Sequence, residues 1–126
     1  MLTEKIIGAA IEVHRLLGPG LLESTYEKSL THELQSKGLK VESQILMPIK
    51  YKELEVNNGY RIDLIVEKKV VLELKCVEEI SLVHEAQILT YLRHSRISTG
   101  LIINFNVQLL KHGIKRFILN PKKLDL

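Results

Sequence analysis

Asp63, Glu73 and Lys75 lie in two short segments that are otherwise rich in valine, leucine and isoleucine. The segments, YRIDLIV and VVLELK, alternate in polarity as strands do, and the charged run Glu67-Lys68-Lys69 separates them. Carboxylates are hard oxygen ligands, and lysine is a cationic hydrogen-bond donor. Together these side chains could bind a divalent ion and stabilise charge on a phosphate, provided that a hairpin brings them together.

The pairing of the two strands decides where these side chains lie. If Val66 pairs with Val70, Asp63 falls opposite Glu73, and Lys75 lies two positions further along the same face. Two carboxylates in this arrangement repel each other, at a cost of about 0.2–1 kcal/mol and more away from water. A hard ion such as Mg²⁺ would offset the repulsion, while Lys75 would orient or activate the attacking water or stabilise developing charge.

A simpler interpretation of the same hairpin is structural. Asp63, Glu73 and Lys75 could form the solvent-facing side of a half-exposed hairpin and satisfy one another there. Alternation of polar and apolar residues is compatible with both interpretations, so residues elsewhere in the chain must decide between them.

Composition sets outer limits on the class of protein. The 126 residues, 45% hydrophobic and 26% charged, predict one globular domain over residues 1–126. No apolar run approaches the ~20 residues that cross a bilayer, and the start of the chain does not resemble a leader sequence. A single cysteine, Cys76, has no internal disulfide partner, so we expect a buried thiol in a cytoplasmic protein. A net charge of +3 permits nucleic-acid binding without requiring it.

Helical periodicity and its interruptions predict the elements before the hairpin. A first helix, capped by Thr3, is predicted to end at Gly18-Pro19-Gly20. A second helix is predicted over residues 22–37, with Gly38 as its terminator.

Strand signals dominate the rest of the chain. Strands are predicted in LKVESQILMPIKY and on both sides of a hairpin turn at Asn57-Asn58-Gly59. A third helix, capped by Ser81, is predicted to end before Gly100, and LIINF and KRFIL are predicted late strands joined by a short polar or helical connection. The order α-α-β-β-β-β-α-β-β indicates a mixed α/β or α+β domain around one sheet.

Two motifs resemble those of a known group of enzymes. An acid in one strand followed by Glu-x-Lys in the next, Asp63 and Glu73-Leu74-Lys75, resembles the motif of the PD-(D/E)XK nuclease superfamily, although Ile62 stands where that motif has proline. GLLESTY, residues 20–26, resembles the signature of the GxxExxY family, small bacterial and archaeal proteins assigned to that superfamily. The resemblance covers nearly the whole chain and implies a restriction-endonuclease-like fold, with one mixed sheet flanked by helices.

The resemblance also implies roles for individual residues. Asp63, Glu73 and the Leu74 carbonyl would bind Mg²⁺ or Mn²⁺, Glu23 would complete or support this set of ligands, and Lys75 would position the water that attacks a phosphodiester. Glu23 also has a structural interpretation, because an acid in the first turn of a helix is stabilised by the helix dipole. For Tyr26, a hydrogen bond to an active-site carboxylate and simple packing are both open.

A further pair lies on the third predicted helix. Gln87 and Tyr91 are four residues apart on one helical face, and Gln-x-x-x-Tyr resembles the extra motif of RecB-like members of the superfamily. There the two side chains help to hold the scissile strand. His84, one turn earlier, could contact phosphate or simply pack.

These observations lead to one hypothesis and its alternatives. The hypothesis is a divalent-metal-dependent nuclease acting on DNA. One alternative is a non-catalytic nucleic-acid-binding or assembly module that retains the nuclease fold, and another is an enzyme acting on RNA. A homodimer, formed through the first helix or the LIINF strand, could supply additional substrate-binding surface.

Overall fold

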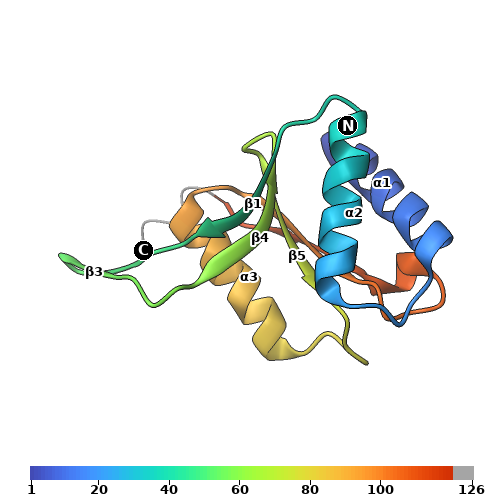
Figure 1. Cartoon of the computed structure of the whole chain (residues 1–126). Coiled ribbons are helices and arrows are strands. Elements are labelled where there is room, and N and C mark those ends of the chain that lie inside the picture. Colours follow the sequence, from blue (N-terminus) through green and yellow to red (C-terminus); the bar gives the residue numbers. More distant parts are fainter. Residues whose placement is uncertain (121–126) are drawn as a thin grey trace.

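A mixed five-stranded sheet forms the centre of the structure, a computed structural model that describes residues 1–120 (Figure 1). Its strand order is β1-β4-β5-β6-β7, in which β5 and β6 are parallel and all other neighbours are antiparallel. The strands of this sheet are β1 (Val41–Leu46), β4 (Arg61–Val66), β5 (Val70–Lys75), β6 (Thr99–Asn104) and β7 (Ile114–Ile118).

A second, two-stranded sheet is a hairpin of β2 (Ile49–Tyr51) and β3 (Leu54–Val56). In Figure 1 this hairpin extends away from the five-stranded sheet. Lys52 in its turn has the left-handed φ of 55° that tight hairpin turns require.

Helices cover both faces of the five-stranded sheet. The helices α1 (Leu2–Leu17) and α2 (Glu23–Ser36) lie together on one face, and α3 (Leu82–Ser95) lies on the other (Figure 1). Apolar side chains fill both interfaces. The α1/α2 side contains Ile6, Leu30, Leu72, Leu101 and Phe105, and the α3 side contains Val71, Ile88, Leu92 and Ile102. The observed α/β/α layering confirms the predicted mixed sheet flanked by helices.

The predicted ends of the first two helices are confirmed. Gly18 follows α1 with a φ of 70°, and Gly20 has a φ of 99° before α2 begins. At the end of α2, Gly38 has a φ of 80° and its N–H donates to Gln35 O. These torsion angles are those that glycine adopts without steric cost.

The predicted caps have different outcomes. Thr3 is not a cap, because α1 begins at Leu2 after Met1 and the Thr3 side chain is buried within the first turn. Ser81 does cap α3, since its hydroxyl accepts a hydrogen bond from His84 N and His84 Nδ1 accepts one from Ser81 N. The structure therefore gives His84 a capping role.

The strands after α2 differ from the prediction in two places. The predicted strand LKVESQILMPIKY is divided into β1 and β2 at Met47-Pro48, where proline cannot donate to a ladder. The turn at Asn57-Asn58-Gly59 does not close a hairpin, because β3 pairs with β2, while β4 pairs with β1 and β5.

The late part of the chain is largely as predicted, with one correction. LIINF forms most of β6, and the connection to β7 contains a short 3₁₀ helix, Leu110–Gly113. The LIINF strand cannot form a dimer interface, because β6 lies between β5 and β7 and residues Leu101, Ile102 and Ile103 are fully buried.

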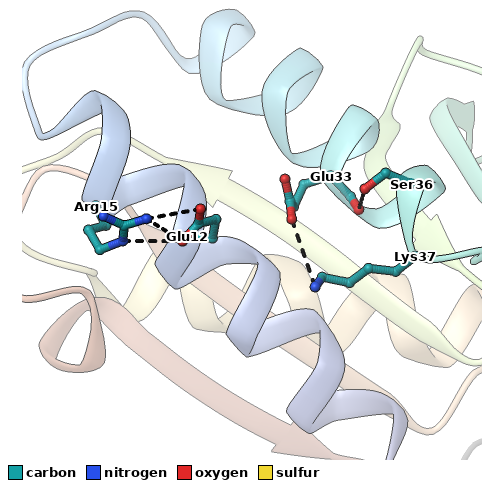
Figure 2. Close-up of polar contacts among 5 residues, drawn as sticks. All are labelled: Glu12, Arg15, Glu33, Ser36 and Lys37. Atoms are coloured by element: carbon teal, nitrogen blue, oxygen red, sulfur yellow. Dashed lines mark hydrogen bonds and ion pairs between the residues drawn. The ribbon is translucent and has the colours of Figure 1, made fainter.

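Exposed ion pairs lie on α1 and α2, as Figure 2 shows. Arg15 contacts Glu12 at 2.9 Å, and Lys37 contacts Glu33 at 3.8 Å. Such surface pairs contribute about 0–1 kcal/mol to stability. Over residues 1–120, no helix is long and apolar enough to cross a membrane.

Candidate active site

Asp63 and Glu73 lie where the regular pairing of β4 with β5 ends. Val66 pairs with Val70, as predicted, and the ladder continues to Leu64 and Leu72. The next pair in this register is Asp63 opposite Glu73. There each side chain is held by the other strand: Asp63 N donates to Glu73 Oε2 at 3.0 Å, and Leu74 N donates to Asp63 Oδ2 at 2.8 Å.

The alternation of β4 is broken beside Asp63. Leu64 packs on the α1/α2 side, but Ile62 and Ile65 both pack on the α3 side. The regular alternation expected for YRIDLIV would place Ile62 on the same face as Leu64, and for this residue the expectation is wrong. Gln44 lies in β1, which pairs with β4 on the side opposite β5. It has a φ of 51° and is the position at which the pairing of β1 with β4 is interrupted. A local irregularity in one strand of a pair re-aims the side chains around it.

The two carboxyl groups have raised proton affinities. Glu73 is only 4% exposed, and burial, followed by repulsion from Asp63, raises its pKa to about 8. Burial also raises the pKa of Asp63, against the hydrogen bond from Leu74 N and the attraction of Lys75. Both groups would be stabilised as carboxylates by a nearby cation.

Lys75 is placed to act on both carboxylates. It follows Glu73 by two residues at the end of β5, is half-buried, and lowers the pKa of Asp63 and of Glu73 by attraction. Its main chain is fixed by β6, since Lys75 O accepts a hydrogen bond from Phe105 N at 2.9 Å.

Glu23 reaches the same end of β5 from α2. Its Oε2 accepts a hydrogen bond of 3.2 Å from Cys76 N, the residue after Lys75. Its negative charge contributes to the raised pKa of Glu73 and, after burial, to the raised pKa of the half-buried Cys76 thiol. Glu23 thus lies in the first turn of a helix and beside the carboxylate pair, so that its two interpretations are compatible.

Two residues that the sequence analysis did not identify complete this cluster. Gln44 Nε2 donates to Glu27 Oε1 at 2.6 Å and to Asp63 Oδ1 at 3.4 Å. Burial raises the pKa of Glu27, and repulsion from Asp63 and Glu23 adds to this effect. The spacing of four residues between Glu23 and Glu27 is a signal for Glu27, because such residues share a helical face. No comparable signal marks Gln44, which occupies an ordinary strand position in the sequence.

Gln87 and Tyr91 are paired on α3, as their spacing predicts. Gln87 Nε2 donates to the Tyr91 hydroxyl at 3.1 Å, and Tyr91 is 3% exposed. Burial, followed by the negative charge of Glu73, raises the pKa of Tyr91. The structure therefore brings this pair within electrostatic reach of the carboxylates.

Tyr26 packs instead of binding an active-site carboxylate. Its hydroxyl donates to Gly18 O and accepts from Leu21 N, and its ring stacks on Phe105 with centroids 4.3 Å apart. The tyrosine of GLLESTY thus joins the start of α2 to the core.

The donor set suits a hard divalent ion of the Mg²⁺ type. Within residues 1–120, no three side chains of histidine, cysteine, aspartate or glutamate form a group that could hold a metal ion by themselves. Asp63 and Glu73 offer two carboxylates, and the Leu74 main chain lies between Glu73 and Lys75. Mg²⁺ is commonly held by one or two carboxylates, with water and substrate phosphate completing its six oxygen ligands. The residues present fit such a site.

Comparisons with known proteins agree with this geometry. Searches among curated proteins and among solved structures found no match. A family model described as the PD-(D/E)XK nuclease superfamily matches residues 1–117. The mixed sheet between helices, with the acidic motif on β4 and β5, is a restriction-endonuclease-like arrangement. The chain belongs to the PD-(D/E)XK nuclease superfamily.

Proposed function

We propose that the protein is a divalent-metal-dependent nuclease that cleaves DNA. The observation that carries this proposal is the Asp63–Glu73 pair, in which a half-buried and a buried carboxyl group, both with raised pKa values, face each other beside Lys75. For a purely structural hairpin such a pair is costly, because its repulsion and desolvation oppose folding. Perturbed groups of this kind cluster at functional sites.

In the proposed mechanism, Asp63, Glu73 and the Leu74 carbonyl hold Mg²⁺ or Mn²⁺. The bound ion supplies Lewis-acid polarisation of the phosphate and a lowered pKa for water. Lys75 orients the attacking water and stabilises the charge that develops on phosphate oxygens. Glu23 holds the main chain after Lys75 through Cys76 N, which fixes the direction of the lysine.

Gln87 and Tyr91 hold the scissile strand in this proposal. Their mutual hydrogen bond orients the tyrosine hydroxyl, and the electrostatic influence of Glu73 on Tyr91 supports a role for this residue near the reacting phosphate. Correct placement of strand and nucleophile accounts for much of the rate in such reactions.

The test is cleavage of labelled single-stranded, duplex and branched DNA by the purified chain with Mg²⁺ or Mn²⁺. We expect Asp63→Asn and Lys75→Ala each to reduce the rate by about 100-fold or more. Glu33→Gln, which changes a half-buried carboxylate that pairs with Lys37 near the end of α2, is the matched control and should cleave normally. Activity that survives both Asp63→Asn and Lys75→Ala would reject the assignment.

Other outcomes distinguish the alternatives. Absence of cleavage by the wild-type protein in either metal, together with nucleic-acid binding that persists in Asp63→Asn, would favour a non-catalytic binding module. An RNA strand of the same sequence separates a deoxyribonuclease from an enzyme that acts on RNA, since only the 2′-hydroxyl and the base differ.

A further inference from the structure

A pocket of about 420 Å³ lies between the β2–β3 hairpin and α3. Ile49 of β2 and Val56 of β3 form part of one wall, and Thr90 of α3 lies on another. Its volume lies within the range of small-molecule sites, about 300–1,000 Å³. The pocket is therefore large enough for one planar heterocyclic group.

The pocket shares two residues with the proposed active site. Gln87 and Tyr91 line it, and the same Tyr91 is affected by the negative charges of Glu73 and Asp63. A group in the pocket would therefore be attached close to the phosphate that the carboxylate pair and Lys75 are proposed to act on.

The chemistry of the lining selects a neutral group. None of the residues that line the pocket carries a formal charge, so the lining offers no countercharge to a phosphate. Apolar walls combine with amide and hydroxyl groups, such as those of Asn58 and Tyr60. A nucleobase has the matching properties, namely an apolar face and hydrogen-bonding edges.

We propose that this pocket binds an unstacked nucleobase beside the scissile phosphodiester, and that the substrate is therefore a single-stranded nucleic acid or a single-stranded end. This inference rests on the proposed nuclease function. A base within a duplex is paired and stacked, so it cannot enter a pocket without being extruded. Tyr60, 47% exposed in the lining, supplies a ring on which a base can stack.

Binding tests the pocket separately from cleavage. We would use Asp63→Asn protein in EDTA, which is proposed to be inactive, and measure fluorescence anisotropy with a labelled oligothymidylate of about 12 nucleotides. Tyr60→Ala in this background should weaken binding by about tenfold, the effect of losing one stacked base. Tyr60→Phe should retain the affinity. Tyr51→Ala is the matched control, because Tyr51 is 62% exposed on the same hairpin and does not line the pocket.

Two further measurements keep the inference open to refutation. Thr90→Trp fills the pocket from α3 and should weaken binding as Tyr60→Ala does. Because the two substitutions act from different parts of the chain, the test remains usable if one of the two variants folds poorly. A strand of the same length that lacks its bases should bind about tenfold less tightly than oligothymidylate. Any one of three results would overturn the proposal. These are equal affinity for oligothymidylate and the strand without bases, equal affinity of the Tyr60→Ala and Tyr51→Ala variants, and tighter binding of duplex than of single-stranded DNA.

The two proposals fail in different ways. Cleavage that survives Asp63→Asn and Lys75→Ala removes the proposed function but leaves the binding results as they are. If Tyr60→Ala does not weaken binding while cleavage still depends on Asp63 and Lys75, only the proposal of a base-binding pocket is rejected. An oligouridylate of equal length determines whether the pocket distinguishes DNA from RNA.

Discussion

The main-chain N–H of Asp63 donates a 3.0 Å hydrogen bond to Glu73 Oε2, across the point where regular pairing of β4 and β5 stops. This hydrogen bond favours the ionised form of Glu73, but burial and the charge of Asp63 outweigh it and raise the pKa to about 8. In the metal-free protein, Glu73 is therefore protonated over a pH range in which an ordinary glutamate is ionised.

Folding stability should reveal this raised pKa. Since the folded state binds the Glu73 proton more tightly than the unfolded state, metal-free protein should lose stability as the pH rises from about 4.5 to about 8. Glu73→Gln has no proton to lose at this position. The free energy of unfolding of Glu73→Gln minus that of wild type should therefore be larger at about pH 9 than at about pH 5. We expect this difference to increase by on the order of 3 kcal/mol between the two pH values.

Urea unfolding at both pH values, in EDTA, measures this difference. Glu33→Gln serves as the control, because the Glu33 carboxylate pairs with Lys37 near the end of α2 and does not belong to the Asp63–Glu73 pair. A relative stability of Glu73→Gln that does not change with pH would contradict the raised pKa.

Metal binding should release a proton below about pH 8. The carboxylate form of Glu73 is the one that can bind Mg²⁺, so its proton must leave as the ion binds. We expect the affinity for Mg²⁺ to rise by up to about tenfold per pH unit below this pKa and to level off above it. Isothermal titration calorimetry in buffers of different ionisation enthalpy counts the protons released. Binding without proton release near pH 6.5 would show that Glu73 is not a ligand or is already ionised.

Glu23 should control the reactivity of Cys76. Burial and the Glu23 carboxylate, which accepts a hydrogen bond from Cys76 N, raise the pKa of this thiol. Glu23→Gln removes the charge while retaining an oxygen acceptor, so the pKa should fall and alkylation by iodoacetamide should accelerate by about two- to fivefold near pH 8. Glu33→Gln should leave the rate unchanged. If Glu23→Gln also leaves it unchanged, the two groups are not in contact in solution.

Tyr26 should be required for stability and not for chemistry. Tyr26→Phe removes the hydroxyl that bridges Gly18 O and Leu21 N but keeps the ring stacked on Phe105. The loss of a hydrogen bond to a buried hydroxyl predicts a decrease of about 1–2 kcal/mol in the free energy of unfolding, measured in urea. The rate of cleavage by the folded protein should stay within about twofold of wild type, because Tyr26 does not contact the carboxylates. A large loss of rate would indicate a catalytic role.

Local signals predicted the main features of this fold. The glycines after α1 and α2 and the Ser81 cap satisfy local backbone requirements, and the structure adopts them. The charged loop fixes the register of Val66 with Val70, although it places Glu67 and Lys68 at left-handed φ values of 54° and 55°. The Asn57-Asn58-Gly59 signal failed because pairing partners are chosen by long-range packing, which placed β3 with β2.

In the candidate site, too, residues marked by local signals were predictable and residues that depend on long-range contacts were not. Asp63 and Glu73 were predictable because register follows from loop length, and Gln87 and Tyr91 because they are one helical turn apart. Gln44 was not predictable. Its role depends on a left-handed backbone angle in β1 and on contacts with residues 17 and 19 positions away in the chain.

Gln44 should act as a positioning residue for Asp63. Its amide donates to both Glu27 and Asp63, so removing it leaves these two half-buried carboxyl groups without that donor, and the pKa of each should rise further. Gln44→Ala removes the amide and keeps the strain of about 1 kcal/mol that any Cβ carries at a φ of 51°, whereas Gln44→Gly removes the amide and also relieves this strain. We expect both variants to cleave about tenfold more slowly near pH 7 and to recover partly at higher pH.

The pH dependence separates positioning from stability. A purely structural role would destabilise Gln44→Ala more than Gln44→Gly in urea and would leave the pH–rate profile of both variants unchanged. Loss of a donor to Asp63 shifts the profile of both variants to higher pH, irrespective of their stability, because ionised Asp63 is then populated only at higher pH. Glu27→Gln is a third arm, since it removes the repelling carboxylate and should shift the profile to lower pH. Profiles that coincide for all variants would exclude Gln44 from the catalytic machinery.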